Sequence, residues 1–148
     1  MSSQPTPDLI RLNLRKILSS EPFLRSWRPS RFLRFTVEET LEGRGCDLTQ
    51  YVLGLEVFDR KESFDPQADP IVRVGATRVR AKLKAYYDTE GREDSVLIEF
   101  PSGYRPVFRW RQETATNGQP IWRRVTRAFV ALITGVLLAV RTVYHKFI

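Results

Sequence analysis

The chain has few of the side chains on which most catalytic and metal sites depend. Its 148 residues include one cysteine, Cys46, and one histidine, His145. A single cysteine excludes an internal disulfide, which suits a reducing compartment. The carboxylates are scattered over predicted helix surfaces and turns, and no glycine-rich phosphate loop follows a predicted strand. The sequence therefore predicts no metal site, no cofactor and no enzymatic activity.

Long hydrophobic runs are also scarce, with one exception near the C-terminus. Residues 1–8 are rich in Ser, Pro and Thr, so we expect no secretory leader. Residues 128–140 are apolar on all sides, but as a helix they reach only about 20 Å against a hydrocarbon core of about 30 Å. Extension to Ile148 supplies the length if Arg141 and Lys146 snorkel. We predict a membrane anchor over residues 123–148 that contacts the membrane through residues 128–148. An interfacial helix and a core or dimer helix are the alternatives.

The C-terminal part has few acidic residues and the rest of the chain has many, so the net charge of +7 is unevenly distributed. Residues 1–110 hold 18 Lys and Arg against 16 Asp and Glu, whereas residues 111–148 hold 6 against 1. Any argument for nucleic-acid binding by the first part must therefore rest on local clusters of charge. Three arginines before the apolar run, Arg123, Arg124 and Arg127, predict that the N-terminal part lies in the cytoplasm, whereas Arg141 and Lys146 after the run count against that orientation. We expect a domain over residues 1–112, a linker over 113–122 and the anchor over 123–148.

Residues 70–87 predict the helix around which the domain is organised. Asp69 can accept hydrogen bonds from free amides of the first turn, and Pro70 suits the first helical position. Apolar residues recur at spacings of four and three and form one stripe that needs a core to cover it. The stripe consists of Val72, Ala76, Val79, Leu83 and Tyr86.

The remaining surface of this helix is basic and slim. Residues 71–87 contain no acid, and Thr77, Ala81 and Ala85 keep the side opposite the stripe small. The cations are Arg73, Arg78, Arg80, Lys82 and Lys84. A helix about 10–12 Å across with such a face fits a DNA major groove of about the same width. A solvated helix face is the alternative. Gly75 indicates either a close approach to the helix backbone or a weakly constrained position.

A β-hairpin follows this helix. Residues 96–100 and 104–108 are apolar, branched or aromatic, and Pro101 and Gly103 separate them. Pro106 confines the second strand to an edge. A basic helix followed by a hairpin is typical of a winged helix, so the predicted fold is mainly α with a small β-hairpin wing.

Three helices are predicted before the basic one. The first is capped by Asp8 and ends near Ser20 because of Pro22, and the second runs over residues 31–42 between a cap at Ser30 and a stop at Gly43. The third covers residues 47–58. Their predicted buried residues are Ile10, Leu14, Ile17 and Leu18; Leu33, Val37 and Leu41; and Leu48, Val52, Leu55 and either Tyr51 or Phe58.

The third helix and the basic helix form a helix-turn-helix with a long turn over residues 59–68. Phe64 is the only large apolar residue in that turn. It is either a packing residue that holds the turn on the core or a contact for a partner protein.

Two motifs resemble the C-terminal DNA-binding domain of OmpR/PhoB-type response regulators. These are Val-x-Val-x-x-x-Arg-Leu-Arg-x-x-Leu and then Ile-x-x-x-x-Gly-Tyr-Arg. The matching residues are Val72, Val74, Arg78, Val79, Arg80, Leu83, Ile98, Gly103, Tyr104 and Arg105. The resemblance covers residues 48–108. The regulators open this domain with a small sheet, where this chain predicts helices, and they carry a receiver domain that has no counterpart here.

A closer resemblance involves residues 30–44, 57–60, 64–66 and 69–74. These segments are similar to the N-terminal winged-helix domain of bacterial proteins that continue into a membrane segment and then repeats. With the apolar segment, the chain resembles membrane-anchored regulators of the ToxR/CadC type, which implies a cytoplasmic domain anchored in a bacterial inner membrane.

The resemblance implies a membrane-tethered transcriptional regulator that binds double-stranded DNA. The helix over residues 70–87 then reads the major groove, and the wing over residues 96–108 meets the minor groove or phosphates. Implied phosphate contacts are Arg80, Lys82 and Lys84; implied base-edge contacts are Arg73, Thr77 and Arg78; Arg105 reaches toward the minor groove. A winged-helix adaptor that binds protein and no DNA is the alternative. A protein partner at loop 59–69 and a homodimer stay open.

Overall fold

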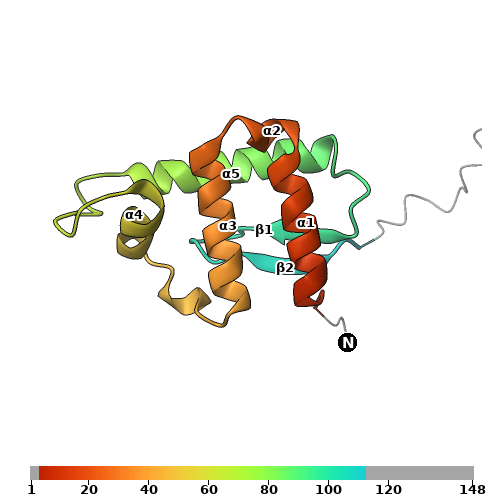
Figure 1. The fold of residues 1–148 in the computed structure, drawn as a ribbon, viewed down its shortest axis with the longest axis horizontal. Helices are drawn as coiled ribbons and strands as arrows, with labels where there is room; N and C mark the ends of the chain where they lie inside the picture. Colours follow the sequence, from red (N-terminus) through yellow and green to blue (C-terminus); the bar gives the residue numbers. More distant parts are fainter. Residues whose placement is uncertain (1–3, 113–148) are drawn as a thin grey trace, which may run out of the picture. The chain divides into compact units, whose positions relative to one another are not determined.

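Helices fill the first part of the domain, and a single hairpin closes it (Figure 1). The computed structural model describes residues 4–112. Its helices are α1 (Pro7–Ser19), α2 (Glu21–Leu24), α3 (Trp27–Leu41), the short 3₁₀ helix η1 (Gly45–Asp47), α4 (Gln50–Phe58) and α5 (Ile71–Asp88). The strands β1 (Val96–Glu99) and β2 (Val107–Trp110) pair antiparallel, from Val96 opposite Trp110 to Glu99 opposite Val107. The predicted mainly helical fold with a small hairpin is confirmed for these residues.

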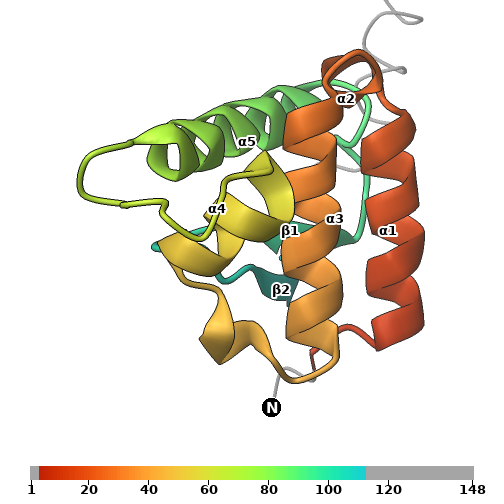
Figure 2. The ribbon, with the colours of Figure 1, turned by 60° about the vertical axis from the view of Figure 1, so that its left-hand side comes forward.

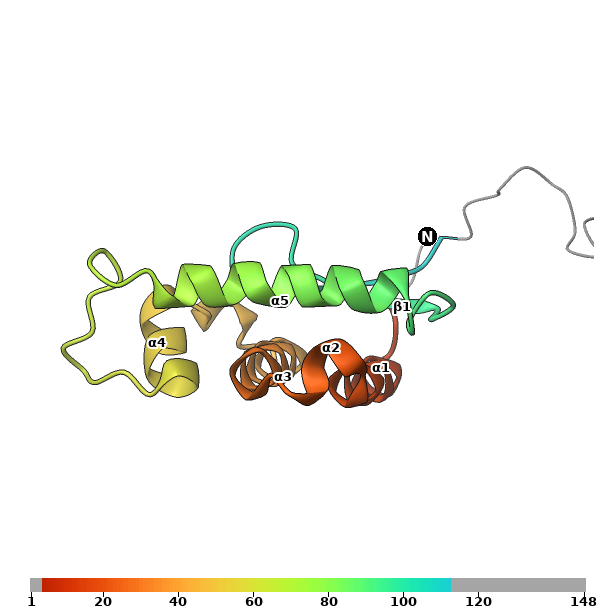
Figure 3. The same ribbon diagram turned by 90° about the horizontal axis from the view of Figure 1, so that it is seen from above.

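The helix α5 lies across the other helices. Figure 3 shows α1, α2 and α3 on one side of α5, with the turn between β1 and β2 rising on the other side. Figure 2 shows α4 beside α3, below the first half of α5, and α5 packs against both of these helices. One long face of α5 is therefore covered, and the opposite face has no helix over it.

The core forms where the predicted stripe of α5 meets α1, α3 and the hairpin. All five stripe residues are buried, as are Ile10, Leu14 and Ile17 of α1. Phe32 of α3 is completely buried, with ring centroids 6.3 Å from Phe58, 6.0 Å from Phe100 and 6.5 Å from Tyr104. Three aromatic rings, from α4 and from the connection between the two strands, thus meet at Phe32.

The predicted starts of the helices need correction. The prediction that Ser30 caps the second helix is wrong, because α3 begins at Trp27 and the Ser30 hydroxyl, inside the helix, donates to the carbonyl oxygen of Phe23 at 3.1 Å. Pro29 lies in the first turn, where its missing N–H leaves no bond unmade, so the helix can begin before it. The first helix begins at Pro7 after the N-cap Thr6, so Asp8 lies in its first turn rather than at the cap, and it ends at Ser19, before Pro22.

The start of α5 differs by one residue from its prediction. Pro70 is the N-cap rather than the first helical residue, and Asp69 lies just before it. A carboxylate oxygen of Asp69 nevertheless accepts the amide of Ile71 at 3.0 Å. The predicted pairing of Asp69 with a free amide of the first turn is therefore confirmed.

The third predicted helix is shorter and turned relative to the prediction. It begins at Gln50, after Thr49, whose hydroxyl accepts the amide of Val52 at 3.2 Å. The fully buried residues are Leu53 and Val57 rather than Val52 and Leu55, which are half-buried. The segment is apolar on nearly every side, so its sequence does not define which face turns inward. Leu48 and Phe58 are buried as predicted.

The second strand also begins later than predicted, at Val107 rather than Tyr104, because Pro106 cannot donate to a ladder. The predicted linker and membrane anchor, residues 113–148, lie outside the described residues. None of the helices within residues 4–112 has both the length and the apolar character needed to cross a bilayer.

Candidate nucleic-acid interface

The uncovered face of α5 is slim in the middle and cationic along its edges. Thr77, Ala81 and Ala85 are exposed along it, and the Thr77 hydroxyl donates to the carbonyl oxygen of Arg73 at 3.0 Å, which folds that side chain against the helix. The exposed cations of the face are Arg73, Arg78 and Lys84. The backbone of α5 can therefore approach a flat or grooved polyanion closely.

Arg73 and Arg78 keep their donors free within the described part of the chain. Neither guanidinium forms a hydrogen bond or an ion pair with another residue of 4–112. Lys84 pairs with Asp88 at 2.5 Å, one turn further on, and both side chains are mostly exposed. An exposed pair of this kind contributes little stability, so Lys84 can exchange its partner for a phosphate at low cost.

Arg80 and Lys82 have structural partners. Arg80 donates from Nε to the carbonyl oxygen of Phe100 at 3.1 Å and from a terminal nitrogen to that of Gly103 at 2.6 Å. Lys82 donates from Nζ to the carbonyl oxygen of Pro22 at 2.6 Å. These two predicted phosphate contacts thus hold the hairpin turn and α2 on α5, although a neutral carbonyl leaves their positive charge uncompensated.

The turn between the strands lies on the open side of α5 (Figure 3). Gly103 has a φ of 64°, a left-handed conformation that glycine adopts without strain. Tyr104 packs against Phe32, and burial raises the pKa of its hydroxyl while the nearby charges of Arg73 and Arg80 oppose that rise. The structure thus brings Arg73, Arg80 and the turn together.

Arg105, the predicted minor-groove residue, points elsewhere. Its guanidinium lies 3.9 Å from the sulfur of Cys46, and a methyl group on Gly45 would lie 3.1 Å from its Nε. Thiol sulfur is a weak acceptor, so this contact holds the exposed side chain only loosely. The structure therefore does not group Arg105 with the cations of α5.

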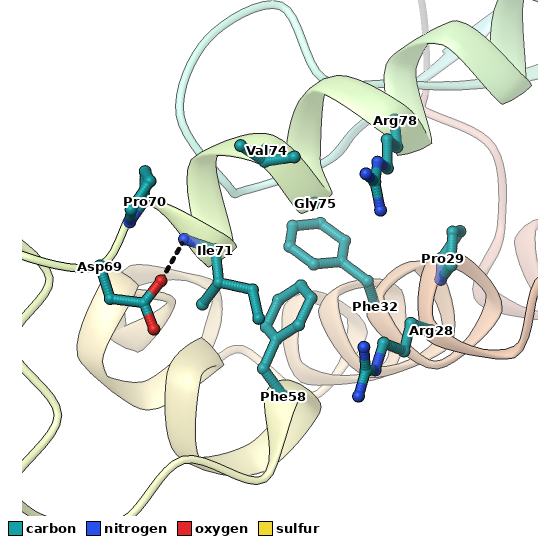
Figure 4. A pocket seen from close by; sticks show the side chains of 10 residues that line it. All are labelled: Arg28, Pro29, Phe32, Phe58, Asp69, Pro70, Ile71, Val74, Gly75 and Arg78. Atoms are coloured by element: carbon teal, nitrogen blue, oxygen red, sulfur yellow. Dashed lines mark hydrogen bonds between the residues drawn. The ribbon is translucent and has the colours of Figure 1, made fainter.

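Arg28 was missed by the sequence prediction and lies close to the predicted site. It is exposed at the start of α3 and lines the same pocket as Arg78 (Figure 4). Because the sequence placed the start of that helix at residue 31, Arg28 fell in a predicted loop. A proline in the first helical turn, here Pro29, was the signal that could have moved the predicted start.

The described residues contain no group of three or more His, Cys, Asp or Glu side chains arranged to hold a metal ion. The chain matches no protein-family model, and searches of curated proteins and of solved structures return no significant match.

Proposed function

We propose that this chain is a DNA-binding transcriptional regulator built on a winged helix-turn-helix and tethered to the membrane by its C-terminal segment. One observation supports it above the others: the uncovered face of α5, which has no acid from residue 71 to residue 87 and displays Arg73 and Arg78 without acidic partners among residues 4–112. The hairpin turn beside that face is the proposed wing.

In the proposed complex α5 lies in the major groove. Arg73, Thr77 and Arg78 approach base edges, because all three are exposed and the two arginines have no other partner within the described residues. Lys84 binds phosphate after leaving Asp88. Arg80 and Lys82 add positive electrostatic potential from their fixed positions. Arg105 leaves the sulfur of Cys46 and contacts a phosphate or the minor groove.

Fluorescence anisotropy of the full-length chain on labelled duplexes, across a salt series, tests this function. We expect the logarithm of affinity to fall linearly with the logarithm of salt concentration, by about 0.9 per phosphate neutralised. Arg78→Ala should relax the preference for one base pair, a loss of about 1–3 kcal/mol on the preferred sequence. Lys84→Ala should weaken all duplexes alike and lower the salt slope by about 1.

Arg15→Ala is the matched control. Arg15 is exposed on α1, which lies on the side of α5 away from the proposed interface, so its loss should leave the affinity unchanged. Equal effects of Arg15→Ala and Arg78→Ala would show non-specific charge attraction only. A folded chain that binds no duplex at low salt contradicts the proposal.

A protein-binding adaptor is the second candidate, and exposed apolar residues favour it. Leu24 is 69% exposed and Trp27 57% exposed, at the end of α2 and the start of α3. Phe64, the predicted partner contact of loop 59–69, is half-buried against the core, and its ring lies where a side chain on Gly54 would be. Phe64 is thus a packing residue, and Leu24 and Trp27 are the better sites at which to cross-link a partner.

A further inference from the structure

The first half of α5 forms one wall of an apolar pocket of about 320 Å³ (Figure 4). The rings of Phe32 and Phe58 line it, with Ile71 beside Phe58 and Val74 above both rings. Gly75 shapes the pocket, because a methyl group there would meet the Phe58 ring at 2.3 Å. A volume of about 300 Å³ is at the lower end of the range of small-molecule binding sites, which are lined mainly by apolar side chains with a few polar groups that orient the ligand.

The pocket lining carries more positive than negative charge, with two arginines and one aspartate among the described residues. Arg28 and Arg78 stand at the same end of it, across the two rings from Asp69 (Figure 4). Among the described residues that line the pocket Asp69 is the one acid, and both its oxygens are engaged, one with the Ile71 amide at 3.0 Å and the other with Arg60 at 2.9 Å. Arg28 lies over the ring of Trp27 at 5.2 Å and forms no ion pair within residues 4–112, and neither does Arg78.

We propose that this pocket binds a small amphipathic monocarboxylate, with its apolar body between Phe58 and Val74 and its carboxylate between Arg28 and Arg78. Guanidinium groups match a planar carboxylate with paired hydrogen bonds, and an apolar wall strengthens those bonds by excluding water. The volume admits one ring with a short chain, which excludes large lipids and peptides.

The ligand has a consequence for DNA that rests on the proposed function. A carboxylate bound to Arg78 occupies a donor that the proposed DNA complex uses, so ligand and duplex compete. By linkage each then lowers the affinity for the other by the same factor. The pocket is a candidate route by which a metabolite releases the regulator from its operator.

Titration of the ¹⁵N-labelled full-length chain with 4-phenylbutyrate tests the site without DNA. We expect saturable amide shifts at residues 71–78 and 28–32, weaker binding of neutral 4-phenylbutan-1-ol by about tenfold or more, and none of 4-phenylbutylamine. Arg28→Gln should weaken the carboxylate about tenfold and leave the alcohol unchanged, whereas Arg34→Gln, exposed on α3 outside the pocket, should change neither.

Equal binding of the acid and the alcohol, or an unchanged affinity in Arg28→Gln, overturns the carboxylate site. The competition is measured separately, as anisotropy of a bound duplex with added 4-phenylbutyrate. If the acid binds but no duplex does, the proposed function fails and the pocket stands. If a duplex binds and the acid does not, only the pocket fails.

Discussion

At the scale of single residues, Gly75 and Phe58 show how tightly α5 is seated. The Phe58 ring occupies the volume that any side chain at position 75 would need, since its Cζ lies 2.3 Å from the place that a methyl group there would take. Both residues are buried. Of the two explanations for a glycine in this helix, the close approach is confirmed.

Gly75→Ala should therefore destabilise the domain, although alanine favours a helix by about 1 kcal/mol over glycine. Displacing a buried ring costs about 1–3 kcal/mol, which exceeds that gain. Urea denaturation measures the change in the free energy of unfolding. The double variant Gly75→Ala, Phe58→Leu should lose less than the sum of the two single variants, and strict additivity would show that the two side chains do not meet.

Asp94, in the connection between α5 and β1, joins α1 and α5 through one carboxylate. It accepts hydrogen bonds from Asn13 at 3.0 Å, Lys16 at 3.0 Å and the Tyr86 hydroxyl at 2.5 Å. Burial by itself would raise the pKa of this carboxyl, but the bonds from Tyr86, Lys16 and Asn13 outweigh burial and hold it below its usual value. Burial, and then the bond to Asp94, raise the pKa of Tyr86.

A lowered pKa makes the contribution of Asp94 depend on pH in one direction. The stabilisation is complete above the unfolded-state pKa, about 3.9, and is lost as the pH falls through the lower folded-state value. Asp94→Asn should cost about 1–3 kcal/mol at pH 7, with the gap from wild type narrowing below pH 4. Urea denaturation at pH 7, 5 and 3 measures it. Glu56→Gln, exposed on α4, is the control and should cost little at any of these values; a constant gap down to pH 3 would contradict the assignment.

At the scale of elements, the hairpin turn depends on α5 through one side chain. Arg80 donates to the carbonyl oxygen of Phe100 at the start of the turn and to that of Gly103 within it, so the hairpin and the helix form one unit. The strands themselves have only four residues each, too few for a hairpin to be stable alone.

Arg80→Ala should free the turn without unfolding the helix. Loss of its two hydrogen bonds to carbonyl oxygens should lower the free energy of local opening by about 1–2 kcal/mol. Amide exchange over residues 100–105 should therefore be roughly five to thirty times faster. Hydrogen exchange followed by mass spectrometry measures this. Arg73→Ala removes an equal charge from the same helix and should leave the exchange unchanged; identical results for the two variants would mean that Arg80 does not hold the hairpin turn.

At the scale of the whole molecule, the membrane tether remains a prediction from residues 123–148. If the segment spans the bilayer, the full-length chain should stay in the membrane pellet after washing with high salt and with alkaline carbonate, because an apolar helix of about 20 residues is not released by either. Replacing Leu137 and Leu138 by Arg should move the chain into the supernatant, at a cost of about 3 kcal/mol for each arginine. Release of the unaltered chain by salt alone would indicate an interfacial helix.

Elements with strongly periodic patterns were predictable from the amino-acid order. The stripe of α5, the buried faces of α1 and α3, the hairpin and the stop at Gly43, with its φ of 84°, follow from spacing, proline and glycine. A spacing of three and four residues allows only one helix face to be apolar, so these predictions needed no knowledge of neighbours.

Which cations of α5 lack a partner among residues 4–112 depends on how the other segments fold around the helix. Arg78 and Arg80 are both basic and lie two residues apart, yet one faces solvent and the other faces two carbonyls of the hairpin. Packing likewise decided which face of α4 is buried, and it brought Arg28 and Arg78 to the lining of one pocket. Local pattern fixes the direction of a side chain relative to its own helix, whereas its partners come from segments that only the fold brings near.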